Sequence, residues 1–153
     1  MSIGHREALP ADHRFVVKSW VASYRDSDSA GLIAVGDWYA VMVPQVTAAM
    51  SRPDVRTVLA YETTNDDPGS NAYGFIVADT AERRPLVYYL YVKQPYRRSG
   101  VARGLFAAVG VDPGLPFDFV CMTEVVSTLR RKIPMARWTP RAGRFPKSET
   151  RNR

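Results

Sequence analysis

The sequence predicts a single mixed α/β domain with a largely central sheet. Its 153 residues fit one domain of ordinary size. Hydrophobic residues make up 46% and charged residues 24% of the chain, as in globular proteins. Two helix-like runs precede three strand-like runs, and helix and strand patterns then alternate to the end. We place the domain at residues 1–140 and regard residues 141–153 as a basic tail.

The N-terminal third predicts two helices. Apolar residues recur at helical spacing over residues 12–24, and the polar residues Arg14, Lys18 and Ser19 lie on the other faces of the predicted helix. A second run begins at Asp37, a suitable N-cap, and continues to Ala49 at spacings of three and four. Pro44 should split or kink this second helix.

The hydrophobic period changes to that of strands from Val55 onward. The segments "VRTVLAYE" and "AYGFIVADT" are rich in β-branched and aromatic residues, and the turn-forming "NDDPGSN" separates them, which predicts a hairpin. The next segment, "RRPLVYYLYV", is almost entirely apolar. It should be a central strand covered on both faces.

The C-terminal half predicts a helix over residues 101–109, a break at "VDPGLP", and a strand in "FDFVCMT". A last helix is expected over residues 124–132, stopped by Pro134, and a weak final strand in "MARWTPRAGRF".

Composition excludes several classes of protein. No stretch of about 20 apolar residues exists. The N-terminal "MSIGHREALPADHR" lacks the apolar core of a signal peptide, so a soluble cytoplasmic protein without membrane partners is expected. A single cysteine, Cys121, and two histidines offer neither an internal disulfide nor a zinc pattern, and no metal site is expected.

The basic excess lies at the C-terminus. Residues 130–153 hold nine of the 21 lysines and arginines and one acid, Glu149, whereas the rest of the chain is slightly acidic. Such a segment, with Trp138 and Phe145 interleaved, suits nucleic acid or another acidic partner. The alternative is a solvated terminus that binds nothing.

The segment "LYVKQPYRRSGVARGLFAAVG" carries the strongest functional signal. A strand that passes through a glycine turn into a helix exposes backbone N–H groups at the positive end of the helix dipole, which favours phosphate. Gly100 lets a ligand approach the backbone, and Arg97, Arg98 and Arg103 add positive charge. A purely structural glycine is the alternative. The segment matches neither the P-loop pattern GxxxxGK[ST] nor the dinucleotide-binding pattern GxGxxG.

The same residues resemble motif A of the GNAT superfamily of acyl-CoA-dependent N-acyltransferases, in which Arg or Gln is followed by Gly and then Gly or Ala. Arg97, Gly100 and Ala102 occupy these places, after a strand end like the family's, Leu90 to Val92, and the lead-in Pro95-Tyr96. The order of predicted elements is also similar, with a first short strand around residues 3–8. The resemblance implies the GNAT fold, with a splayed mixed sheet flanked by helices.

The resemblance also implies how acetyl-CoA binds. The pantetheine arm would pair with the backbone of Leu90, Tyr91 and Val92, and the pyrophosphate would bind loop and helix amides after Arg97. These are the amides of Arg98, Ser99, Gly100, Val101, Ala102 and Arg103. The two N-terminal helices would wall the acceptor pocket with some of Trp20, Tyr24, Trp38 and Tyr39, unless these are core aromatics.

The catalytic groups depart from the family pattern. Leu86 stands where many members carry Glu, and Arg130 where many carry Tyr. Tyr88, with the strand parity of Leu90 and Val92, and Ser127, one helical turn before Arg130, are the substitutes we predict. A buried strand tyrosine and a helix-surface serine are the plainer interpretations. Glu62 is a possible base or only a charged strand end, and Cys121 suits a small core residue.

The predicted function is therefore transfer of an acyl group, most often acetyl, from acyl-CoA to a primary amine of a small molecule or protein. The alternative is a non-catalytic GNAT-fold module that binds CoA, or one that associates with nucleic acid through its tail.

Overall fold

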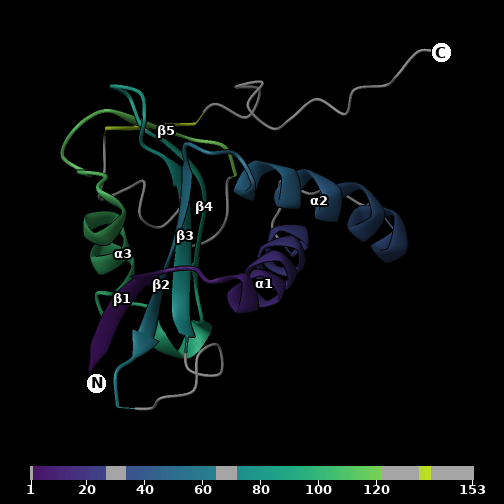
Figure 1. Cartoon of the computed structure of the whole chain (residues 1–153), viewed down its shortest axis with the longest axis horizontal. Coiled ribbons are helices and arrows are strands. Elements are labelled where there is room, and N and C mark those ends of the chain that lie inside the picture. Colours follow the sequence, from purple (N-terminus) through teal and green to yellow (C-terminus); the bar gives the residue numbers. More distant parts are fainter. Residues whose placement is uncertain (1, 27–33, 65–71, 122–134, 139–153) are drawn as a thin grey trace.

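A computed structural model describes residues 2–26, 34–64, 72–121 and 135–138. Its centre is a six-stranded sheet in the order β1-β2-β3-β4-β5-β6 (Figure 1). The strands are β1 (Ile3–Glu7), β2 (Val55–Glu62), β3 (Ala72–Asp79), β4 (Leu86–Val92), β5 (Phe117–Phe119) and β6 (Ala136–Trp138). The first four strands pair antiparallel, whereas β4 with β5 and β5 with β6 are parallel. The mixed α/β prediction is confirmed.

Helices cover both faces of this sheet. The helices α1 (His13–Arg25) and α2 (Val35–Met50) lie on one face, and α3 (Val101–Val109) lies on the other (Figure 1). Two separate hydrophobic clusters correspond to the two faces, the first built around Trp20 and Phe75 and the second around Ile76 and Leu105. We call them the α1/α2 cluster and the α3 cluster. They make β4 a central strand covered on both faces, as its apolar sequence predicts.

The helix α1 has the amphipathic pattern expected from its sequence, with Val16, Trp20 and Val21 fully buried against the sheet. The Trp38 indole of α2 donates a hydrogen bond to the Val21 carbonyl at 2.9 Å. Trp20 and Trp38 are therefore core residues, the plainer of the two interpretations offered by the sequence.

Helix α2 is continuous through Pro44, so of the two predicted effects of this proline, a split or a kink, the split does not occur. Proline removes one N–H donor and its ring must clear the preceding turn. Pro44 is exposed, so its ring points away from the core, while Trp38, Met42 and Val46 keep the opposite face buried. Packing on that continuous face outweighs the single lost hydrogen bond.

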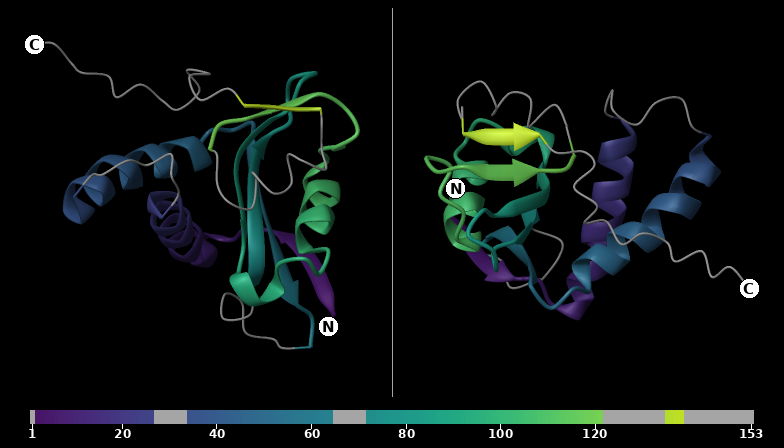
Figure 2. Two further views of the ribbon diagram at one scale, coloured as in Figure 1. Left: turned by 180° about the vertical axis from the view of Figure 1, so that it is seen from behind. Right: turned by 90° about the horizontal axis from the view of Figure 1, so that it is seen from above.

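Strand β5 is shorter than predicted, because it ends at Phe119 and the described residues Val120 and Cys121 lie outside it. Strand β6 is described over Ala136–Trp138, where the described residues end. Figure 2 shows these two strands side by side at one edge of the sheet, seen from above. The expected helix over residues 124–132, Ser127 within it, and the basic tail lie outside the described residues.

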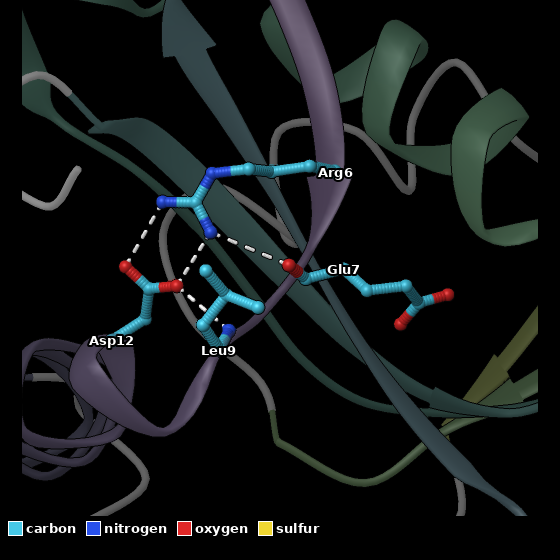
Figure 3. A network of polar contacts seen from close by, with 4 residues as sticks. All are labelled: Arg6, Glu7, Leu9 and Asp12. Carbon is cyan, nitrogen blue, oxygen red and sulfur yellow. Dashed lines mark hydrogen bonds and ion pairs between the residues drawn. The ribbon is translucent and has the colours of Figure 1, made fainter. Parts of the chain in front are cut away.

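A partly buried ion pair fixes the N-terminal strand to the first helix (Figure 3). The Arg6 guanidinium on β1 binds the Asp12 carboxylate through both terminal nitrogens, at 2.5 and 3.0 Å, and the Leu9 N–H donates to Asp12 at 2.8 Å. Asp12 is 1% exposed. The Arg6 hydrogen bond holds the pKa of Asp12 below its ordinary value despite this burial.

Within the described ranges, no helix is long and apolar enough to cross a membrane. The same part of the chain brings together no group of three or more histidine, cysteine or acidic side chains that suits a metal ion.

Candidate functional site

The strands β4 and β5 form a fork in the sheet. They pair at Leu86 with Asp118 and at Val87 with Phe119. The last described contact between them is the Val120 N–H, which donates to the Val87 carbonyl at 3.1 Å. Beyond it, β4 runs on to Val92 without a described partner strand on that edge. Among the described residues, the fork therefore leaves backbone groups of β4 beyond Val87 without a partner strand, as a site for an extended ligand would require.

A β-bulge in β4 decides which groups these are. Val77 of β3 lies opposite Tyr89, and the next residue, Ala78, lies opposite Val87, so Tyr88 is the extra residue. The Tyr89 side chain thus joins Tyr88 in the α1/α2 cluster, whereas Leu90 and Val92 pack in the α3 cluster. The prediction that Tyr88 shares the parity of Leu90 and Val92 is wrong, because the extra residue reverses the alternation.

The bulge also sets the direction of the backbone. The Lys93 N–H donates to the Tyr73 carbonyl of the neighbouring chain segment at 2.8 Å, so Tyr91, two residues earlier, also directs its N–H and carbonyl toward β3. Leu90 and Val92 direct theirs into the fork. Of the three strand residues predicted for pantetheine binding, only these two have the backbone orientation that the role requires.

The loop after β4 has the geometry of an anion-binding turn. It contains the short helix η3 (Gln94–Tyr96), and Arg98 and Gly100 adopt the left-handed conformation, with φ of 66° and 85°. Gly100 is the N-cap of α3, and the first helical hydrogen bond runs from the Gly104 N–H to the Gly100 carbonyl at 3.1 Å. The N–H groups of Val101, Ala102 and Arg103 precede that bond and form the open first turn.

The side chains around this loop leave its backbone accessible. Arg98, Ser99 and Gly100 are exposed, and a Cβ at Gly100 would meet no heavy atom within 4 Å. Arg97 turns inward instead, and its Nε donates to the Val92 carbonyl at 3.1 Å, which joins the loop to the end of β4. The loop and the fork are therefore continuous, and all the loop residues predicted for pyrophosphate binding lie together at one end of β4.

The predicted catalytic side chains are placed as follows. Tyr88 is fully buried, and its hydroxyl accepts a hydrogen bond from the Arg52 guanidinium at 3.2 Å. Leu86, at the position of the missing glutamate, is also fully buried among apolar residues. Ser127 lies outside the described residues.

Glu62 is not close to the fork's closed end. It accepts a hydrogen bond from the Tyr73 hydroxyl, which lowers the pKa of Glu62 and raises that of Tyr73 to about 12. The Tyr73 ring lies 4.4 Å from that of Tyr96, next to the glycine loop. Glu62 therefore belongs to the loop end of the strands.

Comparison with solved structures shows that the fold of this chain is similar to that of several acetyltransferases. A GNAT-family protein from Staphylococcus aureus matches with a TM-score of 0.52 and 13% identity, over 69% of this chain and 86% of that one. The aminoglycoside 6'-N-acetyltransferase AAC(6')-Ih from Acinetobacter baumannii matches with a TM-score of 0.52 and 14% identity, over 86% and 89%. The chain has the GNAT acetyltransferase fold.

A third structure with the GNAT fold is the PaiA N-acetyltransferase from Thermoplasma acidophilum, in complex with coenzyme A. It matches with a TM-score of 0.50 and 15% identity, over 90% of this chain and 79% of that one. A GNAT-family protein from Desulfovibrio desulfuricans is 21% identical, but the match spans only 64% of its length, with a TM-score of 0.44. No protein-family model and no curated protein sequence matches the chain.

The sequence did not indicate a cluster of protic side chains beside the closed end of the fork. Ser23 and Tyr24 from the last turns of α1 lie with Tyr89 of β4 and with Cys121, just after β5. Cys121 is buried, and burial raises the pKa of its thiol to about 12, so it is a core residue and no thiolate nucleophile. No local pattern could reveal this cluster, because even the bonded pair Ser23 and Tyr89 is separated by 66 residues in the chain.

Proposed function

We propose that this protein is an N-acetyltransferase that uses acetyl-CoA and acts on a primary amine. The observation that carries the proposal is the continuity of the loop and the fork. The left-handed Gly100 and the open first turn of α3 lead directly, through the Arg97 contact with Val92, to the edge of β4 that has no partner strand among the described residues. An anion site joined to a strand edge suits a ligand with a diphosphate at one end and amides along its length.

The groups of acetyl-CoA match these positions in chemistry. The pyrophosphate would accept hydrogen bonds from the N–H groups at Ser99 to Arg103, at the positive end of α3. The two amides of the pantetheine arm would pair with the backbone of Leu90 and Val92, as an added strand does. From Val92 to Tyr88 the strand runs about 13 Å, at roughly 3.3 Å per residue. The thioester would then lie near the bulge.

The comparisons support the same cofactor and reaction. A protein of this fold binds coenzyme A, and another is an aminoglycoside N-acetyltransferase. At the thioester, backbone N–H groups near the bulge would stabilise the oxyanion formed when an amine attacks. Because acyl-CoA is an intracellular metabolite, we also infer a cytoplasmic location. The reaction itself calls for no metal.

A second candidate function follows from Leu86. Its apolar, fully buried side chain offers no carboxylate to accept the proton of an attacking ammonium. A chain that binds CoA without catalysis would have the same loop and fork. The two candidates make the same prediction for CoA binding and opposite predictions for turnover.

Thiol release separates these two functions. The protein is incubated with acetyl-CoA and a panel of primary amines that includes an aminoglycoside, a polyamine, an aromatic amine and a lysine peptide. An acetyltransferase releases CoA thiol in proportion to enzyme and acetylates at least one amine, as seen by mass spectrometry. Saturable CoA binding with no thiol release above the protein-free rate would instead identify a binding module.

A further inference from the structure

The closed end of the fork brings two strands and one helix to a single point. Val87 and Phe119 form the last residue pair of β4 and β5. Tyr89 and Cys121 each lie two residues beyond that pair, one on each branch, and both pack in the α1/α2 cluster. The β4 bulge is what brings Tyr89 to this face. A ligand arm that enters the fork from the glycine loop therefore ends beside these two side chains.

The last turns of α1 add two hydroxyl groups. The Ser23 Oγ lies 2.6 Å from the Tyr89 hydroxyl, and the Tyr24 hydroxyl is hydrogen-bonded to the Cys121 thiol. The Tyr24 ring is held by the Trp38 ring at 5.4 Å and by the Tyr89 ring at 6.2 Å. Four groups that carry protons thus meet at this point of the α1/α2 cluster.

The hydrogen-bond directions distinguish the two tyrosines. Ser23 donates its single proton to the Ser19 carbonyl at 2.5 Å, so the Tyr89 hydroxyl must donate to Ser23. Tyr89 is also almost completely buried, at 2% exposed. The Tyr24 side chain is only half-buried, and its partner is a sulfur atom. Its hydroxyl therefore has a sulfur atom as a neighbour and lies near the surface of the cluster.

If the protein transfers acyl groups as proposed above, the departing CoA thiolate needs a proton. We propose that the Tyr24 hydroxyl supplies it, from the α1 side of the closed end of the fork. This role goes to a residue of the first helix, in place of the late-helix tyrosine whose position Arg130 occupies.

The step balances without any further reactant. The amine nitrogen attacks the thioester carbonyl carbon, so that a C–N bond forms and the C–S bond breaks with its electron pair going to sulfur. The Tyr24 O–H gives its proton to that sulfur. The proton lost by the amine nitrogen returns through water to the Tyr24 oxygen. Desolvation raises the pKa of Tyr24 to about 12, so the phenol stays protonated at neutral pH and is ready to donate.

The test uses Tyr24→Phe in the full-length protein, with the best amine from the panel. We expect kcat to fall about 100-fold, the typical contribution of a positioned acid, while KM for acetyl-CoA and the Kd for CoA change less than twofold. The ratio of wild-type to variant kcat should rise between pH 7 and 9, because solvent protons replace the lost phenol and become scarcer. Tyr24→His, which keeps an N–H donor, should recover part of kcat.

Two controls exclude a structural role. Tyr61→Phe removes a hydroxyl from a partly buried tyrosine on β2 and should leave kcat unchanged. Cys121→Ala removes the sulfur that Tyr24 contacts and should lower kcat less than threefold.

The outcomes distinguish this inference from the proposed function. If the wild-type enzyme turns over and Tyr24→Phe keeps kcat within threefold of it, Tyr24 is not the proton donor. The proposed acetyltransferase function would still stand. An equal loss in Cys121→Ala, or a loss shared by kcat and CoA affinity, would also overturn it, since both indicate damage to the cluster. If the wild-type protein acetylates no amine, both the function and the proton donor are refuted together.

Discussion

Two glycines with nearly the same backbone conformation flank α3 and have different expected roles. Gly100 precedes the helix with φ of 85°, and Gly110 follows it with φ of 86°. A Cβ at either position would meet no heavy atom within 4 Å. A side chain at either position would therefore strain the left-handed backbone without a steric clash. The two glycines are thus a matched pair for testing the loop.

Gly100→Ala and Gly110→Ala should each lower the free energy of unfolding by about 1–2 kcal/mol, the cost of a left-handed residue with a Cβ. Only Gly100→Ala should weaken CoA binding, by at least about tenfold. The strain tends to push its backbone away from the left-handed conformation and turn the loop amides. Urea unfolding and calorimetric titration measure the two effects. Equal loss of CoA affinity in both variants would show that the loop at Gly100 has no special part in binding.

The Arg6–Asp12 pair predicts a pH dependence of stability. The pKa of Asp12 is lowered in the fold, so its contribution is present above the ordinary carboxyl pKa and is lost as pH falls through the folded pKa. Asp12→Asn should cost about 2 kcal/mol at pH 7, and this difference should shrink below about pH 4. The exposed Asp54→Asn serves as control. A difference that stays constant down to pH 2 would contradict the role of the charge.

At the scale of elements, Pro44 offers a direct test of why α2 is continuous. Pro44→Ala restores a backbone N–H donor on the exposed face of the helix without touching its buried face. We expect the free energy of unfolding to rise by about 1–3 kcal/mol, the lower end reflecting the added freedom of the unfolded chain. Thermal and urea unfolding measure it. A destabilised variant would mean that Pro44 makes contacts that its exposure does not suggest.

The order of the elements could be predicted from the sequence, because each element has its own hydrophobic period and turn residues. The bulge at Tyr88 could not, since an extra residue in "LVYYLYV" changes neither composition nor apolar character. This single backbone irregularity reversed the predicted side-chain parity at Tyr88. It also decided that Leu90 and Val92, and not Tyr91, direct their backbone groups into the fork.

The candidate site also has one part that the sequence predicts and another that only the fold reveals. The glycine loop could be predicted because its chemistry is local, within a few residues of Gly100. The contacts of Ser23 and Tyr24 with Tyr89 and Cys121 are long-range, and only the fold brings these residues together. The Arg6–Asp12 pair was also missed, because two ordinary charges on a strand and a turn have no periodic pattern.

At the scale of the whole molecule, charge separates the tail from the domain. The basic excess of the chain lies in residues 130–153, and the remainder is slightly acidic. If the tail recruits nucleic acid, deleting residues 141–153 should abolish retention on immobilised DNA at low salt, and added salt should abolish retention of the full chain. CoA binding should be unchanged by the deletion. Equal retention of both proteins would refute a nucleic-acid role for these residues.

Both candidate functions depend on the loop and the fork as one continuous site, and calorimetric titration of the full-length protein with acetyl-CoA and with CoA measures whether that site binds its ligand. We predict saturable binding of both ligands with one site per chain and dissociation constants in the micromolar range. The absence of binding heat with either ligand at several temperatures, together with an unchanged melting temperature in their presence, would show that the loop and the fork do not form a CoA site.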